Sequence, residues 1–384
     1  MIQQFEFNTS KSLVVARGGS GSVLVEKILA MGCRTPFVVT DRGVLSVGLL
    51  EKTLVALKQG GMNTATFSEV LADPPESVIL AATNRAIEHG ADCVIGFGGG
   101  SSMDVAKLVA VLARGREHLS DIYGVGQIKG SRLPLVLVPT TAGTGSEVTP
   151  ISIVTTGESE KKGVVSPVLL PDLAFLDAEL TVGLPPHITA ATGIDAMVHA
   201  IEAYTSKRLK NPVSDCLARE ALRLLAENIR TACASGNNLA ARENMLLGAC
   251  LAGIAFANSP VAGVHALAYP VGARFHVAHG LSNSLVLPSV MRFNLSQAAE
   301  LYAELAGVIG ANVGTYFEKA TWFVDYLAAL PAELGLETRL SQVGIQEKDL
   351  DDLASDAMKQ TRLLINNPRE IHLSDARAIY SEAL

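Results

Sequence analysis

Cys93-Val-Ile-Gly-Phe-Gly-Gly-Gly-Ser-Ser-Met-Asp-Val-Ala-Lys107 runs from an apolar, β-branched stretch through three glycines into a helical pattern. It predicts a buried strand, a tight turn at Gly98, Gly99 and Gly100, and a helix with Ser101 as its N-cap. Such a turn presents bare N–H groups at a positive helix end, where a phosphate can approach closely because glycine lacks Cβ. Tight connection alone is the alternative, since the pattern is not Gly-x-Gly-x-x-Gly.

Outward from this turn, the first half of the chain alternates short apolar runs with amphipathic ones, which indicates an α/β domain with a mainly parallel sheet. Expected strands are Ser12–Ala16, Phe37–Thr40, Thr64–Phe67, Cys93–Phe97, Leu135–Val138, Ile151–Thr155 and Ala174–Leu176. Expected helices are Ser22–Met31, Leu45–Gln59, Glu76–His89 and Ser101–Ala113.

The second half has almost no strand pattern and reads as an all-helical domain. Its expected helices include Val213–Thr231, Leu239–Ala257, Gln297–Val308 and Tyr316–Leu330, the last stopped by Pro331. Two prolines interrupt the pattern at 185 and 186, so we place the domain boundary there, giving domains 1–184 and 185–384.

Composition narrows the class of protein. The chain has 384 residues, 48% of them hydrophobic, and a net charge of −7, which disfavours nucleic acid as a partner. Its five cysteines are scattered without Cys-x-x-Cys spacing, as expected for reduced thiols in the cytoplasm. We find no signal-like N-terminus and no apolar stretch of membrane-spanning length, so neither secretion nor membrane insertion is expected.

Four residues of the second half form a candidate metal site. Asp195 and His199 stand four apart, so on a helix they reach one ion from adjacent turns, and His265 and His279 would complete the set. Imidazole-rich ligation suits Fe(II) or Zn(II) better than Mg²⁺ or Ca²⁺. Coincidence among eight histidines is the alternative, and a structural zinc site would more usually include cysteine.

Two further stretches suit a dinucleotide. Asp41 ends an early strand, where a carboxylate can bind the adenine-ribose hydroxyls of NAD and repel the extra phosphate of NADP, although such an acid is also a common helix cap. The loop Pro139–Pro150 follows a later strand and is rich in hydroxyls and glycines, among them Thr140, Thr141 and Thr144. Its donors suit phosphates and an amide, although a plain turn of small residues is also consistent with the pattern.

Together these motifs resemble the iron-containing (type III) alcohol dehydrogenase family. The matching stretches are 98–107, 139–149, Ala191–Tyr204, His265–Asn283 and Asn367-Pro368-Arg369. The resemblance implies a dehydroquinate synthase-like architecture, with a Rossmann-like NAD-binding domain at 1–184 and a helical metal- and substrate-binding domain at 185–384. It also implies a homodimer or larger homo-oligomer.

The same resemblance assigns residues position by position. The family's metal and catalytic positions fall on Asp195, His199, His265 and His279, with Fe(II) expected and Zn(II) as the alternative. Its dinucleotide contacts fall on Asp41, Gly98, Gly99, Gly100, Ser101, Thr140, Thr141, Thr144 and Lys161, with Lys162 as a second alignment for the lysine.

The expected reaction is hydride transfer between a small alcohol or hydroxy acid and the nicotinamide, with the ion acting on the alcohol oxygen as a Lewis acid. Alternatives are a zinc polyol dehydrogenase, a dehydroquinate-synthase-like cyclase, a metal-independent reductase and a non-catalytic dinucleotide-binding protein.

Two departures from the family pattern bear on mechanism. Many relatives carry a histidine where this chain has Tyr269, so a histidine proton relay is in doubt, and His276 is considered as another exit. Arg274, between the last two ligands, is considered as a contact for an anionic substrate, against the alternative of a solvated loop arginine.

Overall fold

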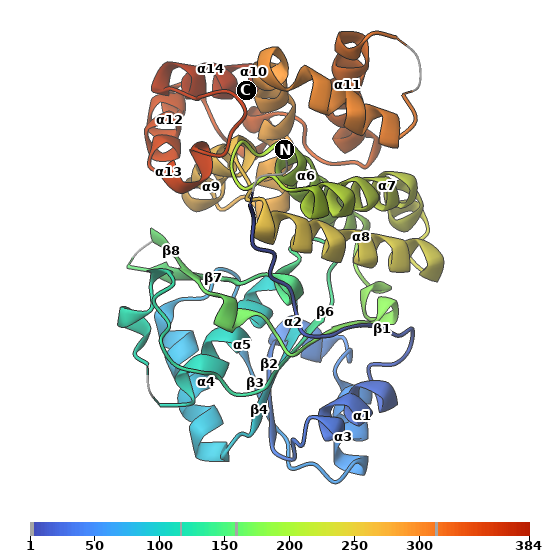
Figure 1. The fold of residues 1–384 in the computed structure, drawn as a ribbon, viewed down its shortest axis with the longest axis vertical. Coiled ribbons are helices and arrows are strands. Elements are labelled where there is room, and N and C mark those ends of the chain that lie inside the picture. Colours follow the sequence, from blue (N-terminus) through green and yellow to red (C-terminus); the bar gives the residue numbers. More distant parts are fainter. Residues whose placement is uncertain (1–3, 116, 158–159, 312–313) are drawn as a thin grey trace. The chain divides into compact units, whose positions relative to one another are not determined.

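The computed structural model describes residues 4–115, 117–157, 160–311 and 314–384, which form two compact units (Figure 1). The α/β unit comprises Asn8–Thr141 and Gly145–Val182. The helical unit comprises Gly183–Leu384 together with Ala142–Thr144 and the described residues before Asn8.

A six-stranded parallel sheet forms the centre of the α/β unit. Its order is β1 (Leu13–Val15), β9 (Leu173–Leu176), β6 (Leu135–Pro139), β4 (Cys93–Gly98), β2 (Pro36–Asp41) and β3 (Ala65–Val70). The chain passes from β2 outward to β3 and then returns to β4 on the other side of β2. That reversal lies between β2 and β4, where ligands of open α/β sheets bind beyond the carboxyl ends of the strands.

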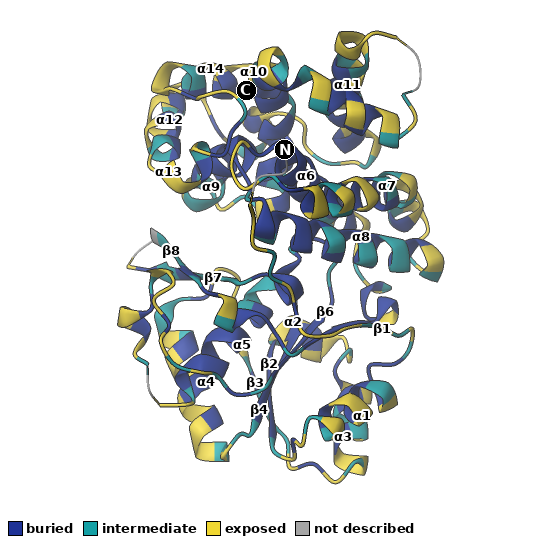
Figure 2. Cartoon of the chain, in the orientation of Figure 1, coloured by how far each residue is buried: buried dark blue, intermediate teal, exposed yellow. Residues whose placement is uncertain are grey.

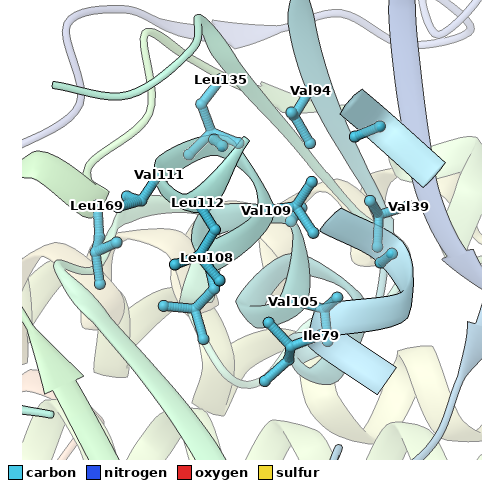
Figure 3. Packing of buried hydrophobic residues seen from close by; sticks show 14 of the residues in the cluster. Val39, Ile79, Val94, Val105, Leu108, Val109, Val111, Leu112, Leu135 and Leu169 are labelled. Carbon is cyan, nitrogen blue, oxygen red and sulfur yellow. The ribbon is translucent and has the colours of Figure 1, made fainter. Parts of the chain in front are cut away.

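Helices cover both faces of this sheet. On one face, α1 (Ser22–Ala30) and α3 (Glu51–Gln59) pack in one hydrophobic cluster with the strands. On the other, α4 (Glu76–His89) and α5 (Gly100–Leu112) pack in a second cluster, in which Figure 3 shows Val109 among the side chains gathered with Val39 and Val94. Figure 2 shows the central strands as buried, which explains their continuous apolar runs.

Shorter elements complete the α/β unit. A second sheet has the order β5 (Gly124–Val125), β8 (Glu160–Val165) and β7 (Ile151–Thr156), with β7 and β8 antiparallel. The remaining elements are α2 (Arg42–Ser46) and the 3₁₀ turns η1 (Leu119–Asp121), η2 (Ser146–Val148), η3 (Pro167–Leu169) and η4 (Ala178–Thr181).

The helical unit contains α-helices and two 3₁₀ turns in its described residues. They are α6 (Pro186–Thr205), α7 (Pro212–Ala234), α8 (Leu239–Asn258), α9 (Gly263–Phe275), α10 (His279–Val308), α11 (Tyr316–Glu333), η5 (Leu340–Val343), η6 (Glu347–Asp349), α12 (Leu350–Met358), α13 (Thr361–Leu364) and α14 (Leu373–Ala383). The expected fold class, α/β followed by all-helical, is therefore confirmed.

Several expected elements need correction. The run Leu45–Gln59 is two helices, α2 and α3, because Gly48 adopts a positive φ of 74° between them. The expected helix Gln297–Val308 is the last part of the much longer α10. Pro331 does not stop α11, which continues to Glu333, and the strands β5 and β8 were not expected.

The expectation that no apolar stretch reaches membrane-spanning length was wrong. Helix α8 is long and apolar enough to cross a bilayer by length and composition, with a mean hydropathy of 1.3 in its most apolar window. That window is 61% buried within the protein, as is common for core helices, so this single helix is weak evidence of a membrane span.

Candidate metal centre and nucleotide pocket

Asp195, His199, His265 and His279 come together in the helical unit. One ligand atom from each lies within 4.8 Å of the others. From the same Asp195 Oδ1, the Nε2 atoms of His199, His265 and His279 lie 4.0, 3.8 and 3.5 Å away. Three helices therefore present one carboxylate and three imidazole nitrogens to a common point.

Local geometry explains how three helices converge. Asp195 and His199 occupy successive turns of α6, and the His199 ring stacks on Phe256 of α8 with centroids 4.3 Å apart. His279 is the first residue of α10. The next residue, Gly280, allows α10 to approach α6, because a Cβ there would lie 2.4 Å from the carbonyl oxygen of Ala191.

A carboxylate behind the cluster orients His265. Glu202, one turn after His199 on α6, places Oε2 2.6 Å from His265 Nδ1. The same carboxylate accepts hydrogen bonds from the N–H of Ala262 and Val264 at the start of α9. Because Nδ1 donates to Glu202, the Nε2 lone pair of a neutral His265 faces the other ligands, as in many metal sites.

An amide lies beside the carboxylate ligand. Asn283, one turn after His279, is buried and donates from Nδ2 to Asp195 Oδ1 at 2.6 Å. Its Nδ2 also lies 3.3 Å from Nε2 of both His265 and His279. Neither Glu202 nor Asn283 was assigned a role from the sequence, although both lie within the stretches that carry the family resemblance.

The protonation states of His199 and Asp195 favour the binding of a metal cation. Burial lowers the pKa of His199 to about 3, so its imidazole is neutral near pH 7 and has a lone pair to donate. Burial alone would raise the pKa of Asp195, but the three imidazoles and the Asn283 amide outweigh it and hold that pKa below its ordinary value. A buried carboxylate with three imidazole donors therefore fits a divalent transition metal.

In the α/β unit, a pocket of about 690 Å³ lies beyond the carboxyl ends of β2 and β4. Its lining includes Asp41, Glu69, Gly99, Gly100 and Ser101. The size is in the range of small-molecule sites, and the place is the one where doubly wound sheets bind nucleotides.

The glycine turn has a steric reason. Gly98 adopts a φ of 153°, and a Cβ there would meet Ser102 Oγ at 2.7 Å and Asp41 Oδ2 at 3.2 Å. The expectation that Ser101 caps the helix was wrong, because α5 begins at Gly100 with Gly99 as its N-cap. The Ser101 side chain is thus within the first turn, where it lines the pocket instead.

Asp41 has two structural contacts at the pocket. Its Oδ1 accepts a hydrogen bond from Val44 N and caps α2, and its Oδ2 accepts one from Ser102 Oγ at 3.1 Å. Asp41 is therefore a helix cap, which was the alternative considered from the sequence. It does not compete with a ligand role, since each carboxylate oxygen can accept more than one hydrogen bond.

A buried lysine ties α5 to the loop after β6. Lys107 Nζ donates to Ser146 Oγ at 2.8 Å, Thr149 Oγ1 at 3.2 Å and Ile151 O at 2.7 Å. Burial lowers the pKa of Lys107, and Asp104, 3.5 Å away, opposes that shift. This network, which sequence reasoning did not assign, holds the segment Ser146–Ile151 against the helix that follows the glycine turn.

The other expected cofactor residues described next are not among those that line the pocket. Thr140 is buried and its N–H bonds to Gly98 O at 2.9 Å, which places it beside the glycine turn. Thr144 clusters with the helical unit. Lys161 forms an ion pair with Asp73, and Lys162 lies 5.6 Å from the centre of the Tyr123 ring. The cofactor roles of these residues remain predictions.

The residues considered for substrate and proton handling differ in their settings. Arg274 pairs with Asp352 at 3.0 Å and Asp356 at 2.5 Å on α12, so the guanidinium is already neutralised. His276 is an exposed C-cap of α9 with a φ of 56°. Tyr269 alone lies at the cluster, its ring centre 5.9 Å from that of His279 and 6.3 Å from that of His265.

Family models built from known proteins match both units of the chain. Sequence models of "Iron-containing alcohol dehydrogenase" and of "Fe-containing alcohol dehydrogenase family, C-terminal" match residues 12–178 and 189–384. Long-chain-alcohol dehydrogenase 1 of Geobacillus thermodenitrificans (strain NG80-2) is 40% identical over 370 residues, covering 95% of this chain and 93% of its own.

Solved structures show the same likeness. A 1,3-propanediol oxidoreductase superposes with a TM-score of 0.96 at 33% identity over the full length of both chains. Sulfoacetaldehyde reductase from Bifidobacterium kashiwanohense, solved with NAD⁺, gives a TM-score of 0.89 at 27% identity over 99% of both chains.

Fold, site and relatives define the class as an NAD-linked oxidoreductase, an alcohol dehydrogenase or aldehyde reductase. Within that class, the chain belongs to the iron-containing alcohol dehydrogenase family.

Proposed function

We propose that this protein interconverts a small alcohol and its aldehyde with NAD(H), using one divalent metal ion held by Asp195, His199, His265 and His279. The observation that carries the proposal is the convergence of these four ligand atoms within 4.8 Å of one another. Fe(II) is the ion we favour, because the family is iron-containing and the donor set suits it, with Zn(II) as the alternative.

When bound, the ion would supply Lewis acidity toward the alcohol or carbonyl oxygen. The protein's own residues prepare for this. Glu202 fixes the ring orientation and tautomer of His265, and Asn283 fixes the carboxylate of Asp195 through its amide. Burial keeps His199 neutral at physiological pH, so this ligand can bind the ion without first losing a proton.

The cluster has one open side, and we propose that substrate approaches there. Asp195, His199 and His265 are buried, whereas the side chain of His279 is 46% exposed. Tyr269, one turn after His265, lies next to His279 on that side. The phenol hydroxyl of a tyrosine can donate a hydrogen bond, so we propose that Tyr269 orients the substrate oxygen.

For the cofactor, we propose NAD(H) bound at the pocket beyond β2 and β4. The bare N–H groups at the start of α5 suit the pyrophosphate, because Gly99 and Gly100 have no side chain between backbone and ligand. Asp41 suits the ribose hydroxyls of NAD and disfavours the phosphate of NADP by charge repulsion.

The substrate we propose is an uncharged alcohol or aldehyde. Relatives named long-chain-alcohol dehydrogenase and 1,3-propanediol oxidoreductase have neutral compounds in their names, whereas sulfoacetaldehyde reductase is named for an anionic aldehyde. An anionic hydroxy acid is less favoured, because Arg274, the cation we considered for its carboxylate, is paired with Asp352 and Asp356.

We also propose a cytoplasmic homodimer or larger homo-oligomer. The edge strand β1 exposes the apolar side chains of Leu13 and Val15, and an open edge of this kind is usually covered. None of the five cysteines, all within the described residues, forms a disulfide, which suits a reducing compartment. Sedimentation of the purified protein tests the assembly: a monomer at micromolar concentration would contradict it.

A substrate panel tests the function. Protein loaded with Fe(II), and separately with Zn(II), is assayed for NADH formation from primary alcohols of increasing chain length, diols and hydroxy acids, and for NADH oxidation by the matching aldehydes. We expect turnover on neutral alcohols and aldehydes with either ion bound. Binding of NADH without turnover of any member would favour the non-catalytic alternative.

A further inference from the structure

A second cluster of metal- or redox-capable groups lies in the α/β unit. The Sγ atoms of Cys33 and Cys93 and a carboxylate oxygen of Asp92 lie within 4.8 Å of one another. Cys33 is 2% exposed and Cys93 is fully buried. None of these residues belongs to the pocket beyond β2 and β4 or to the metal cluster, so they are available for a separate role.

The backbone holds the two thiols together. Cys93 is the first residue of β4, and its partner on β2 is Pro36, three residues after Cys33. Cys33 follows the end of α1, where its N–H bonds to Ile28 O at 3.4 Å. The two cysteines are thus about sixty residues apart in sequence but lie side by side where β2 and β4 begin.

A metal ion is the less suitable occupant of this cluster. Both oxygens of Asp92 already accept backbone hydrogen bonds, Oδ2 from Arg34 N at 2.6 Å and Oδ1 from Thr35 N at 2.9 Å. Even with Asp92 counted, the cluster offers three ligands, whereas structural zinc is bound by four. Two adjacent thiols can instead form a disulfide bond with each other, which needs no further ligand.

We propose that Cys33 and Cys93 form a reversible disulfide when the protein meets hydrogen peroxide. The Cys33 thiolate attacks the peroxide, its S–O bond forms as the O–O bond breaks, and the leaving hydroxide takes up the proton released by Cys33 to give the first water. Cys93 sulfur then attacks Cys33 sulfur, the S–S bond forms and the hydroxyl leaves, taking up the Cys93 proton as water. Two thiols lose two electrons, and the peroxide is reduced to two waters.

The environment distinguishes the two sulfurs. A hydrogen bond from Cys93 lowers the pKa of the Cys33 thiol, and that same bond raises the pKa of Cys93. We take Cys33 as the attacking sulfur because it is 2% exposed, whereas Cys93 is fully buried. Because both are buried, a small oxidant reaches them only through local opening, so the reaction is slow compared with that of an exposed thiol.

The disulfide would join the turn after α1 to the start of β4, the strand whose other end, Gly98, begins the glycine turn. It closes a long loop of chain, so it limits the unfolded state more than the folded one. We therefore expect the oxidised protein to melt about 5 °C higher, with little change in turnover.

The test uses the full-length protein loaded with Zn(II), which avoids iron-catalysed peroxide chemistry. Prereduced protein is treated with hydrogen peroxide, its remaining thiols are alkylated under denaturing conditions, and peptides are mapped without reduction. We expect one crosslinked peptide pair, Cys33 with Cys93, lighter by two hydrogens and released by dithiothreitol. The melting temperature is followed in the same samples.

Matched variants give the controls. Cys33→Ser and Cys93→Ser should each abolish the crosslink and the rise in melting temperature, while Cys216→Ser, at an exposed position, should change neither. Wild-type protein that keeps both thiols alkylatable after its exposed thiol is oxidised would overturn the proposal. So would a crosslink to another cysteine, or a second bound zinc ion that Cys33→Ser removes.

Discussion

Glu202 Oε2 lies 2.6 Å from Nδ1 of His265, and the Glu202 carboxylate also receives the N–H groups of Ala262 and Val264. Three donors thus converge on two acidic oxygens. The arrangement sets the tautomer of one metal ligand and fixes the start of α9 with the same side chain.

Replacing this carboxylate by an amide should weaken the metal centre. Glu202→Gln offers one acceptor oxygen where three donors point, so one donor meets an N–H group instead. We expect metal affinity to fall about 10- to 100-fold, measured by competition with a chromophoric chelator. Glu227→Gln, on an exposed part of α7, is the control and should bind metal normally. Unchanged affinity in Glu202→Gln would show that Glu202 is only structural.

The approach of α10 to α6 should tolerate no side chain at position 280. A Cβ at Gly280 would lie 2.4 Å from Ala191 O, so Gly280→Ala must push the two helices apart. We expect a loss of about 2 kcal/mol in the free energy of unfolding by urea, and weaker metal binding.

The control for that substitution lies on the same helix. Gly307 has open space around its Cβ position, so Gly307→Ala should be neutral or stabilise by about 0.5 to 1 kcal/mol through helix propensity. Equal stability of Gly280→Ala and wild type would mean that the helices are not packed as closely as the structure has them.

Cofactor choice should depend on the charge of Asp41. Asp41→Ser keeps a side-chain oxygen to cap α2 but removes the carboxylate from the pocket. We expect the ratio of kcat/KM for NADP⁺ over NAD⁺ to rise about tenfold or more, because a repulsion of about 1.4 kcal/mol is lost per factor of ten. Asp325→Ser, an exposed acid on α11, is the control. A constant ratio would remove Asp41 from cofactor selection.

An ion-pair cluster beside β6 and β9 gives a pH-dependent prediction. Burial alone would raise the pKa of Asp172, but hydrogen bonds from Arg132 and Lys11 outweigh it and lower that pKa below its ordinary value. Because the pKa of Asp172 is lower in the folded protein, its carboxylate stabilises the fold at pH values above the pKa of an unfolded aspartate, which is about 3.9. The stabilisation is lost as pH falls through the folded value.

Asp172→Asn should therefore cost about 2 kcal/mol in the free energy of unfolding at pH 7. The difference from wild type should shrink as urea unfolding is measured from pH 5 down to pH 3. A difference that stays constant over this range would mean that the Asp172 charge adds nothing to stability.

Local patterns predicted the elements well, because their causes lie within a few residues. The spacing of Asp195 and His199 placed both on one helical face, and alternating apolar runs predicted the parallel sheet. The helix after the glycine turn was expected, but not its start at Gly100, because Ser101 was assumed to be the cap that Gly99 provides.

Contacts between distant segments were beyond the sequence pattern. Glu202 stands three residues after a predicted ligand, yet its role depends on the N-terminus of α9, about sixty residues later. Arg274 lies between two ligands in sequence, but its carboxylate partners come from α12. The convergence of His265 and His279 on α6 was supplied by the family resemblance, since spacing alone does not fix how helices pack.

The central claim is that one metal ion, held by the four ligands, makes the protein an alcohol dehydrogenase. Protein stripped by a chelator and titrated with Fe(II) or Zn(II) should regain alcohol-dependent NADH formation in proportion to bound metal, saturating at one ion per chain. His265→Ala should bind NADH but retain less than about a thousandth of kcat/KM, a loss of about 4 kcal/mol in transition-state stabilisation. Full NADH formation by metal-free protein, or by His265→Ala, would contradict the account.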